Sequence, residues 1–395
     1  MKQSSALLIA RINILFACLI LAACATSSDS KNQDVLPDRS TTTGLTDNQI
    51  ALAGFTESTI ASRDLLGYRP LKRVLVTLAD DAQLDRLRDI APEVEFVGSA
   101  GLVPDANTSG EFDAVILVCS FPGALDYAEN VAWIHSYSAG VENCLAHPSL
   151  RSRNAGKQDY IITNSSGTAA SIIGEHAIAM MMSFSRGLHH FRDAQATQSW
   201  SRSMVDESSV TTTIGGKTIL ILGLGSIGKE VARRAHALGM RVIATRNSSR
   251  SGPDYVDYVG LSDETFRLAS EADVIVNALP LTDTTRGMLN KDFFEVMKNT
   301  ALYVSVGRGA TTNTDDLLVA LQSGELAGAA LDVTDPEPLP DNHPLWKQKN
   351  VIITPHLAGT GGDARARVYG LLLENVRRYQ AGEPLINPVS SKAGY

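Results

Sequence analysis

The sequence lacks several features that would assign it to a class at once. Its 395 residues contain only four cysteines. The sequence has no internal repeat and no cluster of basic side chains. The formal net charge of −8 argues further against a nucleic-acid partner. Beyond residue 24 only Cys119 and Cys144 remain, so at most one disulfide can form and a disulfide framework is excluded. We expect Cys119, which ends an apolar run, to be a buried small residue rather than a reactive thiol.

The chain also has no apolar run long enough to span a bilayer, which takes about 20 residues. The uncharged segment 12–23 is shorter and follows Lys2 and Arg11, as in a secretory signal peptide. It ends in Leu21-Ala22-Ala23-Cys24, which resembles a bacterial lipobox and predicts lipidation of Cys24. An ordinary secretory signal or a short anchor would fit as alternatives.

The predicted signal peptide covers residues 1–24, and residues 25–48, rich in Ser, Thr, Asp and Asn, read as a flexible tether. We therefore expect an exported protein, held by lipid on the periplasmic side of a bacterial membrane. Ala25, in place of Asp after the cysteine, favours the outer membrane.

The remaining length makes two domains the default. Apolar runs predict strands in a first unit at 71–78, 94–97, 113–119, 133–137 and 161–163, with a helix at 81–90. Alternating strands and helices predict a parallel sheet. An apolar helix at 169–191 is expected to be buried between two units. A second unit has predicted strands at 217–222, 241–245, 273–277, 301–306, 327–333 and 351–354, and a helix at 363–379 is expected to return to the first unit.

The most specific motif is Gly223-Leu-Gly225-Ser-Ile-Gly228, which lies between an apolar strand and a helix-like stretch. In that context the pattern predicts a dinucleotide site. Gly223 allows a tight turn, Gly225 lets the backbone approach a pyrophosphate, and Gly228 lets helix and strand pack closely. The N–H groups at the helix start would then bind the phosphates.

Three ionisable residues follow other strands of this second unit: Arg308, Glu337 and His356. Each has an ordinary alternative, as a turn residue, a solvated loop residue or a hydrogen-bonded histidine. Ligands of open α/β sheets bind outside the carboxyl ends of the strands, where all three are expected. An acid, a base and a cation together on that edge predict a catalytic site.

These motifs resemble those of the D-isomer-specific 2-hydroxyacid dehydrogenases. The resemblance covers about residues 71–388 and rests on the glycine motif, Asn277-Ala-Leu-Pro280, Val306-Gly-Arg308-Gly, Leu331-Asp332-Val333, Glu337-Pro-Leu-Pro and Thr354-Pro-His356. It implies an α/β fold of two doubly wound parallel-sheet domains, in which a Rossmann cofactor domain is inserted in a flavodoxin-like catalytic domain. The implied bounds are 49–167 with 356–395 for the substrate domain and 168–355 for the NAD(P)-binding domain. The family is commonly dimeric, so a homodimer is expected.

The resemblance also implies hydride transfer between a nicotinamide and a small D-2-hydroxy or 2-keto acid. His356 would be the acid/base, Glu337 would orient the imidazole, and Arg308 would bind the substrate carboxylate. Backbone N–H groups of Gly140 and Val141 would also hold that carboxylate. Asp332 would accept from the nicotinamide carboxamide, unless it caps a turn. The cofactor-binding set is Gly223, Gly225, Ser226, Ile227, Gly228, Arg246, Asn247, Ser248, Asn277, Leu279, Pro280 and Asp332, and no metal site is expected.

The residue after the second strand distinguishes the two nicotinamides. Arg246 lies 18 residues past Gly228, where this family usually has Asp, and the next carboxylate is Asp254. Arg246, Asn247 and Ser248 offer donors that suit a 2′-phosphate, and Arg250 extends the set. The sequence therefore predicts NADP, with NAD as second choice. A surface turn with relaxed cofactor choice is the alternative.

Two further observations refine the function. Gln195 and Trp200 resemble the hydroxypyruvate/glyoxylate reductase branch, and Glu142 stands where Asp is more usual after Gly-Val. An exported protein with a soluble nicotinamide cofactor is unusual, since the periplasm is not expected to hold a recycling NADPH pool. The alternative to an enzyme is therefore a membrane-tethered NAD(P)-binding module without turnover.

Overall fold

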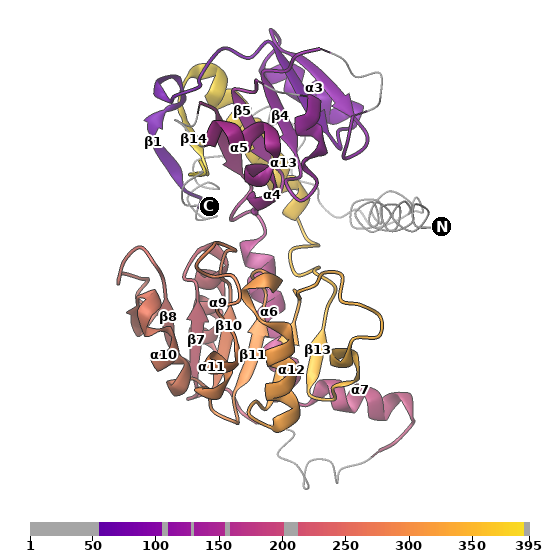
Figure 1. Ribbon diagram of the computed structural model, residues 1–395, viewed down its shortest axis with the longest axis vertical. Helices are drawn as coiled ribbons and strands as arrows, with labels where there is room; N and C mark the ends of the chain where they lie inside the picture. Colours follow the sequence, from indigo (N-terminus) through magenta and orange to yellow (C-terminus); the bar gives the residue numbers. More distant parts are fainter. Residues whose placement is uncertain (1–54, 105–109, 128–129, 155–158, 201–211, 391–395) are drawn as a thin grey trace. The chain divides into compact units, whose positions relative to one another are not determined.

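The computed structural model describes residues 55–104, 110–127, 130–154, 159–200 and 212–390 (Figure 1). The predicted signal peptide, Cys24 and the tether lie outside these residues. No helix within the described ranges is both long enough and apolar enough to cross a membrane.

The first sheet has five parallel strands in the order β3-β2-β4-β5-β6. They are β2 (Arg73–Thr77), β3 (Glu95–Ser99), β4 (Ala114–Leu117), β5 (Trp133–Ser136) and β6 (Ile161–Asn164). Every residue of β4, β5 and β6 is buried, which explains why these strands read as continuous apolar runs. The order matches the flavodoxin-like doubly wound arrangement. Around this sheet lie η1 (Ser62–Asp64), α3 (Asp81–Ile90), η2 (Pro122–Tyr127), α4 (Glu142–Ala146) and α5 (Pro148–Asn154).

The end of the chain returns to this first sheet, as predicted. Helix α13 (Ala364–Ala381) contributes Tyr369, Leu372 and Tyr379 to the same core as Trp133. After it, β14 (Pro384–Ile386) pairs antiparallel with β1 (Glu57–Ala61). Neither of these short strands was predicted from the sequence.

The second sheet has seven strands in the order β13-β12-β11-β10-β7-β8-β9. They are β7 (Thr218–Leu222), β8 (Arg241–Thr245), β9 (Tyr258–Gly260), β10 (Val274–Asn277), β11 (Leu302–Ser305), β12 (Gly328–Leu331) and β13 (Val351–Ile353). The strand order reverses at β7, which pairs with β8 on one side and β10 on the other, so the ligand-binding position of a Rossmann sheet lies at its carboxyl end. The fold class implied by the sequence is confirmed, and β9 is an addition to it.

The register brings the carboxyl ends of these strands level with one another. Leu222 pairs with Asn277, Asn277 with Ser305, and Ser305 with Leu331. The loops that leave the strands therefore emerge along one edge of the sheet. The helices of this part are α9 (Ser226–Ala237), α10 (Thr265–Glu271), α11 (Lys291–Glu295) and α12 (Thr314–Ser323), with η3 (Ser262–Glu264), η4 (Gly309–Thr311) and η5 (Pro344–Lys347).

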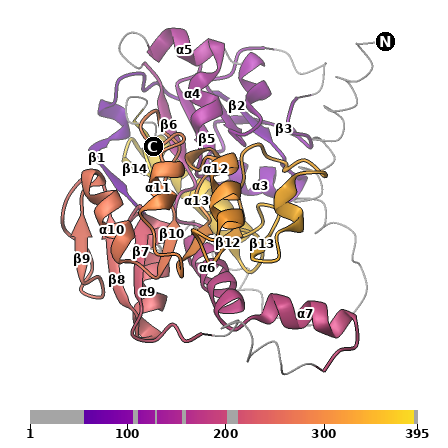
Figure 2. The same cartoon turned by 60° about the horizontal axis from the view of Figure 1, so that its bottom comes forward.

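The helix predicted at 169–191 is wrong in two respects. It forms two helices, α6 (Ala170–Ser185) and α7 (Leu188–Ala196), because Gly187 adopts a φ of 63° between them. Moreover, α6 packs through Ala177, Met180 and Met181 into the core of the seven-stranded sheet rather than between two units. Helix α7 has no buried residue, and Figure 2 shows it extending away from the seven-stranded sheet.

Cys119 is buried as predicted, but it is not a free thiol. Its sulfur is bonded to that of Cys144, and both residues are almost fully buried. Cys119 follows β4 and Cys144 lies in α4, so the bond joins two connections at the carboxyl edge of the five-stranded sheet. The sequence allowed one disulfide but could not show that this pair comes together.

Candidate active site

Glu337 and His356 meet at the carboxyl edge of the seven-stranded sheet. Glu337 follows β12 and His356 follows β13, and the imidazole Nδ1 hydrogen-bonds the Glu337 carboxylate. This hydrogen bond, together with the negative charge of Glu337, raises the pKa of His356, while partial burial opposes the shift. With Nδ1 bonded to the carboxylate, Nε2 is the ring nitrogen left for exchange with a ligand.

The backbone of His356 is held in an uncommon conformation. Its φ of 51° lies in the left-handed region, which non-glycine residues adopt only when the surroundings impose it. Its N–H donates to the carbonyl oxygens of Asp332 at 2.8 Å and Thr354 at 3.0 Å. These bonds fix where the imidazole leaves the chain.

The carboxylate of Asp332 fixes the same loop. It is buried and accepts from the N–H groups of Leu357 and Ala358, each at 3.0 Å, and from the Thr354 hydroxyl at 2.6 Å. His176 on α6 hydrogen-bonds Thr354 in turn, at 3.0 Å. The geometry is that of the turn cap given above as the alternative for Asp332. Its contact with a nicotinamide carboxamide stays a prediction.

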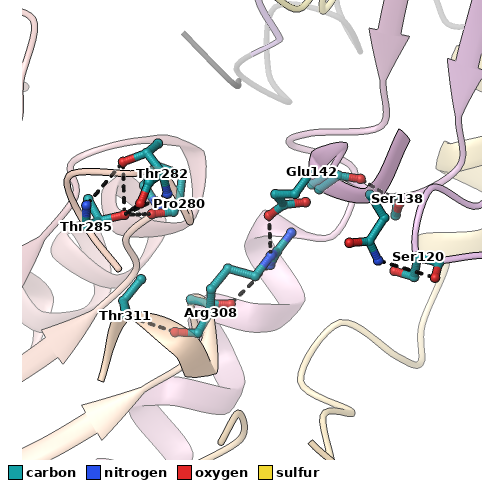
Figure 3. A network of polar contacts seen from close by, with 12 residues as sticks. Ser120, Ser138, Glu142, Pro280, Thr282, Thr285, Arg308 and Thr311 are labelled. Carbon is teal, nitrogen blue, oxygen red and sulfur yellow. Dashed lines mark hydrogen bonds and ion pairs between the residues drawn. The ribbon is translucent and has the colours of Figure 1, made fainter. Parts of the chain in front are cut away.

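Arg308 contacts Glu142, the first residue of α4 in the part of the chain that carries the five-stranded sheet. Its Nε donates to Oε1 of Glu142 at 3.1 Å, and its Nη1 donates to the Gly307 carbonyl at 3.1 Å (Figure 3). The side chains of Arg308 and Glu142 are 31% and 30% exposed, so the ion pair is only partly solvated. The sequence marked Glu142 as a departure from the family pattern but did not place it against Arg308.

The turn predicted to hold a carboxylate lies beside this ion pair. Gly140 and Val141 connect β5 to α4, and the Ser138 hydroxyl donates to the Gly140 carbonyl at 3.0 Å. Asn164 donates to the Ala139 carbonyl at 2.7 Å, which ties the turn to β6. An added Cβ on Gly140 would lie 2.3 Å from Nη2 of Arg308, so the structure places these two residues side by side, and their contact with a substrate carboxylate stays a prediction.

The glycine motif has the geometry that a pyrophosphate needs. Gly223 has a φ of 91°, and a Cβ on Gly228 would lie 2.1 Å from the Gly223 carbonyl oxygen. Helix α9 starts at Ser226 after Gly225, and no side chain caps it. The N–H groups of Ser226, Ile227 and Gly228 thus stand at an uncapped helix N-terminus beside an open glycine. These residues fit a dinucleotide phosphate.

The end of β8 carries the residues predicted to select the cofactor. Arg246 is half-buried and donates from Nη1 to the Ser251 carbonyl at 3.1 Å, whereas Asn247 and Ser248 are exposed. Arg250 is engaged elsewhere, since it pairs with Glu264 and donates to the Tyr258 hydroxyl at 3.2 Å. Of the two arginines, Arg246 is therefore the better placed for a 2′-phosphate.

The loop after β10 completes the predicted cofactor set. Asn277 is fully buried, and its Nδ2 donates to Tyr303, Ser305 and Thr311 at 2.8–3.2 Å. Its Oδ1 accepts from the N–H of Leu279 at 3.1 Å, which shapes the turn toward Pro280. The side chain of Asn277 thus supports the turn, and its contact with a cofactor, like that of Leu279 and Pro280, stays a prediction.

A Rossmann sheet with a glycine loop, and an Arg, Glu and His at the ends of its strands, defines a nicotinamide-dependent dehydrogenase. Comparisons with known proteins agree. The sequence model of the family "D-isomer specific 2-hydroxyacid dehydrogenase, NAD binding domain" matches residues 178–358. An uncharacterized protein of Corynebacterium melassecola is 36% identical over 283 residues, 72% of this chain and 90% of that protein. The glyoxylate reductase/hydroxypyruvate reductase of Mus musculus is 31% identical over 256 residues, 65% of this chain and 76% of that enzyme.

Solved structures show the same relationship. A D-isomer specific 2-hydroxyacid dehydrogenase family protein from Aeromonas salmonicida superposes with a TM-score of 0.69 at 28% identity, over 81% of this chain and 99% of that one. An NADPH-dependent glyoxylate/hydroxypyruvate reductase from Sinorhizobium meliloti, in complex with NADP and sulfate, gives a TM-score of 0.69 at 25% identity, over 82% and 100%. The chain therefore belongs to the D-isomer specific 2-hydroxyacid dehydrogenases, enzymes that act on CH–OH donors.

Proposed function

We propose that this chain reduces small 2-keto acids of the glyoxylate or hydroxypyruvate type to D-2-hydroxy acids with NADPH, and catalyses the reverse reaction. The observation that carries the proposal is the His356–Glu337 hydrogen bond at the same sheet edge as Arg308 and the glycine loop. The names of the Mus musculus and Sinorhizobium meliloti relatives support the substrate class.

Each residue has a distinct role in this reaction. NADPH, when bound at the glycine loop, would supply the hydride that C2 of the keto acid needs, and the keto oxygen needs a proton. Protonated His356 donates that proton from Nε2 and takes it back in the oxidation direction. Glu337 orients the ring and stabilises its charged form. Arg308 and the N–H groups of Gly140 and Val141 bind the substrate carboxylate.

The decisive experiment uses the purified chain without its predicted leader, residues 25–395. We expect NADPH oxidation with glyoxylate or hydroxypyruvate, and its loss in His356→Ala with NADPH binding retained. Nucleotide binding without turnover of any 2-keto acid would instead favour the tethered module.

The choice of NADP rests on Arg246 at the carboxyl end of β8. Arg246→Asp should shift preference toward NAD(H), because it exchanges a phosphate-binding cation for a carboxylate that suits ribose hydroxyls. Arg241→Asp is the matched control, since Arg241 begins the same strand at its opposite end. Equal use of NADH and NADPH by the wild type would contradict this role.

The proposal includes export and lipid anchoring at Cys24. The Cys119–Cys144 disulfide supports it, because such bonds persist in oxidising compartments and are rare in the cytosol. Cys24→Ser should abolish labelling by a radioactive fatty acid and release the protein from the membrane fraction. The cofactor could then be bound tightly and recycled in place by a second substrate.

A homodimer formed through α7 is also proposed. Helix α7 has no buried residue, Leu188 at its start is 54% exposed, and Trp200 beyond its end is 96% exposed, so an interface there would cover apolar surface. Light scattering at the column peak should give twice the chain mass, and Trp200→Ala with Leu188→Ser should lower it. An unchanged mass in that double variant would exclude α7 as the interface.

The domain bounds 49–167 with 356–395, and 168–355, are part of the same proposal. Two apolar cores draw on residues between 65 and 162 together with 369–389, and two others on residues between 173 and 353. Cleavage by dilute protease should therefore concentrate near these bounds.

A further inference from the structure

The ion pair between Arg308 and Glu142 raises a question about the substrate site. Arg308 is the proposed ligand for the substrate carboxylate, yet a carboxylate of the chain itself already contacts its Nε at 3.1 Å (Figure 3). Gly140 lies so close that an added Cβ would stand 2.3 Å from Nη2 of Arg308 and 2.5 Å from Oε2 of Glu142. Glu142 thus stands where the predicted carboxylate-binding turn meets the guanidinium.

The backbone of Glu142 is fixed by its neighbours. Asn143 donates to the Ser120 carbonyl at 3.4 Å, and Cys144 is bonded to Cys119. Val141 is buried in the core of the five-stranded sheet. Because α4 is held at these points, rotation of the Glu142 side chain leaves its backbone, and so its charge, near the site.

Arg308 also has contacts that do not involve Glu142. Its Nη1 donates to the Gly307 carbonyl at 3.1 Å, and its own carbonyl accepts from the Thr311 hydroxyl at 2.7 Å. Gly309 packs against Thr334, where a Cβ would lie 1.8 Å from the carbonyl oxygen. The Arg308 loop and one guanidinium nitrogen are thus held without Glu142, and the role left for Glu142 is to act on the charge of Arg308.

We propose that Glu142 is a specificity-determining residue that competes with the substrate carboxylate for Arg308 and disfavours substrates with a second negative charge. The inference rests on the proposed role of Arg308. With Glu142 in place the guanidinium charge is already balanced, so Glu142 opposes every negative charge that a substrate brings to the pair. A keto acid with a further carboxylate or phosphate is therefore disfavoured more than a monoanion.

The test compares Glu142→Gln with the wild type on glyoxylate, a monoanion, and oxaloacetate, a keto acid with two carboxylates. Glutamine keeps the shape and removes the charge. We expect KM for glyoxylate to fall by about twofold to fivefold, the scale of a partly exposed ion pair, with kcat little changed. KM for oxaloacetate should fall further. Glu175→Gln, which removes an ion pair with Arg234 on α9, is the matched control and should change neither KM.

A rise in KM in Glu142→Gln would mean that Glu142 positions Arg308. Unchanged KM values for both acids would mean that Glu142 does not compete with the substrate carboxylate for Arg308. Either result overturns the inference. These outcomes differ from failure of the proposed function, in which the wild type turns over no 2-keto acid. A second measurement needs no variant. Rising ionic strength should narrow the wild-type preference for glyoxylate over oxaloacetate, because salt screens the repulsion by Glu142. If the wild-type preference for glyoxylate over oxaloacetate does not depend on salt concentration, the proposed repulsion by Glu142 is wrong.

Discussion

His135 makes the five-stranded sheet sensitive to acid. It lies in β5 with no exposed surface, and burial lowers the pKa of its imidazole to about 3. Its Nδ1 lies 2.8 Å from the Thr163 hydroxyl, which also accepts from the Trp133 indole at 3.0 Å. Among the described residues its Nε2 has no hydrogen-bond partner, so the native site stabilises only a neutral ring.

The sign and size of the effect follow from the two pKa values. In the unfolded chain the His135 pKa returns to 6.5, so the unfolded state takes up a proton below that pH while the native state does not. Stability is therefore complete above pH 6.5 and falls as the pH drops toward about 3. At pH 5 the solution lies about 1.5 pH units below the unfolded-state pKa of His135. At about 1.4 kcal/mol per unit, the free energy of unfolding is therefore lower by about 2 kcal/mol.

Urea unfolding at pH 7.5 and pH 5.0 measures this loss. Trp133 is fully buried beside His135, whereas Trp200 and Trp346 are 96% and 47% exposed, so the emission shift on unfolding reports mainly on this sheet. We expect the wild type to lose about 2 kcal/mol more than His135→Phe between these pH values.

His236→Gln is the control, because that histidine is exposed on α9. Between pH 7.5 and pH 5.0 the His236→Gln variant should lose as much free energy of unfolding as the wild type. Equal losses in His135→Phe and the wild type would refute the assignment to His135.

Three further predictions concern the site and its scaffold. Glu337→Gln should lower the pKa of His356. Reduction needs the protonated ring, so its rate falls as the pH rises through that pKa, and in the variant this fall should begin at lower pH. A plot of kcat/KM against pH whose alkaline fall is unshifted would contradict this role of Glu337. Asp332→Asn leaves a buried loop N–H without its acceptor, so kcat should fall about tenfold. The Kd for NADPH, measured by fluorescence, should not change. A higher Kd with an unchanged kcat would instead indicate that Asp332 contacts the nicotinamide directly. Cys119→Ser with Cys144→Ser should lower the urea-unfolding free energy by about 3 kcal/mol, and an unchanged midpoint would mean that the bond is absent in solution.

The sequence by itself determined the elements that have local signals. Parallel strands buried on both faces need continuous apolar runs, so β4, β7, β8 and β11 could be located within one or two residues. The glycine motif could be interpreted for the same reason, since its turn, strand and helix are adjacent in the chain. Arg308, Glu337 and His356 could be chosen because the residues after parallel strands must gather at one sheet edge.

Only the tertiary structure decided which of these residues touch. Arg308 and Glu142 are separated by 166 positions, and Cys119 and Cys144 by 25, so no local pattern pairs them. The buried carboxylate of Asp332 is satisfied by a loop more than twenty residues away, which propensity and periodicity do not report. The break at Gly187 and the strands β1, β9 and β14 were likewise missed. Strand β1 has no buried residue, β9 and β14 have only three residues each, and a single left-handed glycine leaves no periodic signal.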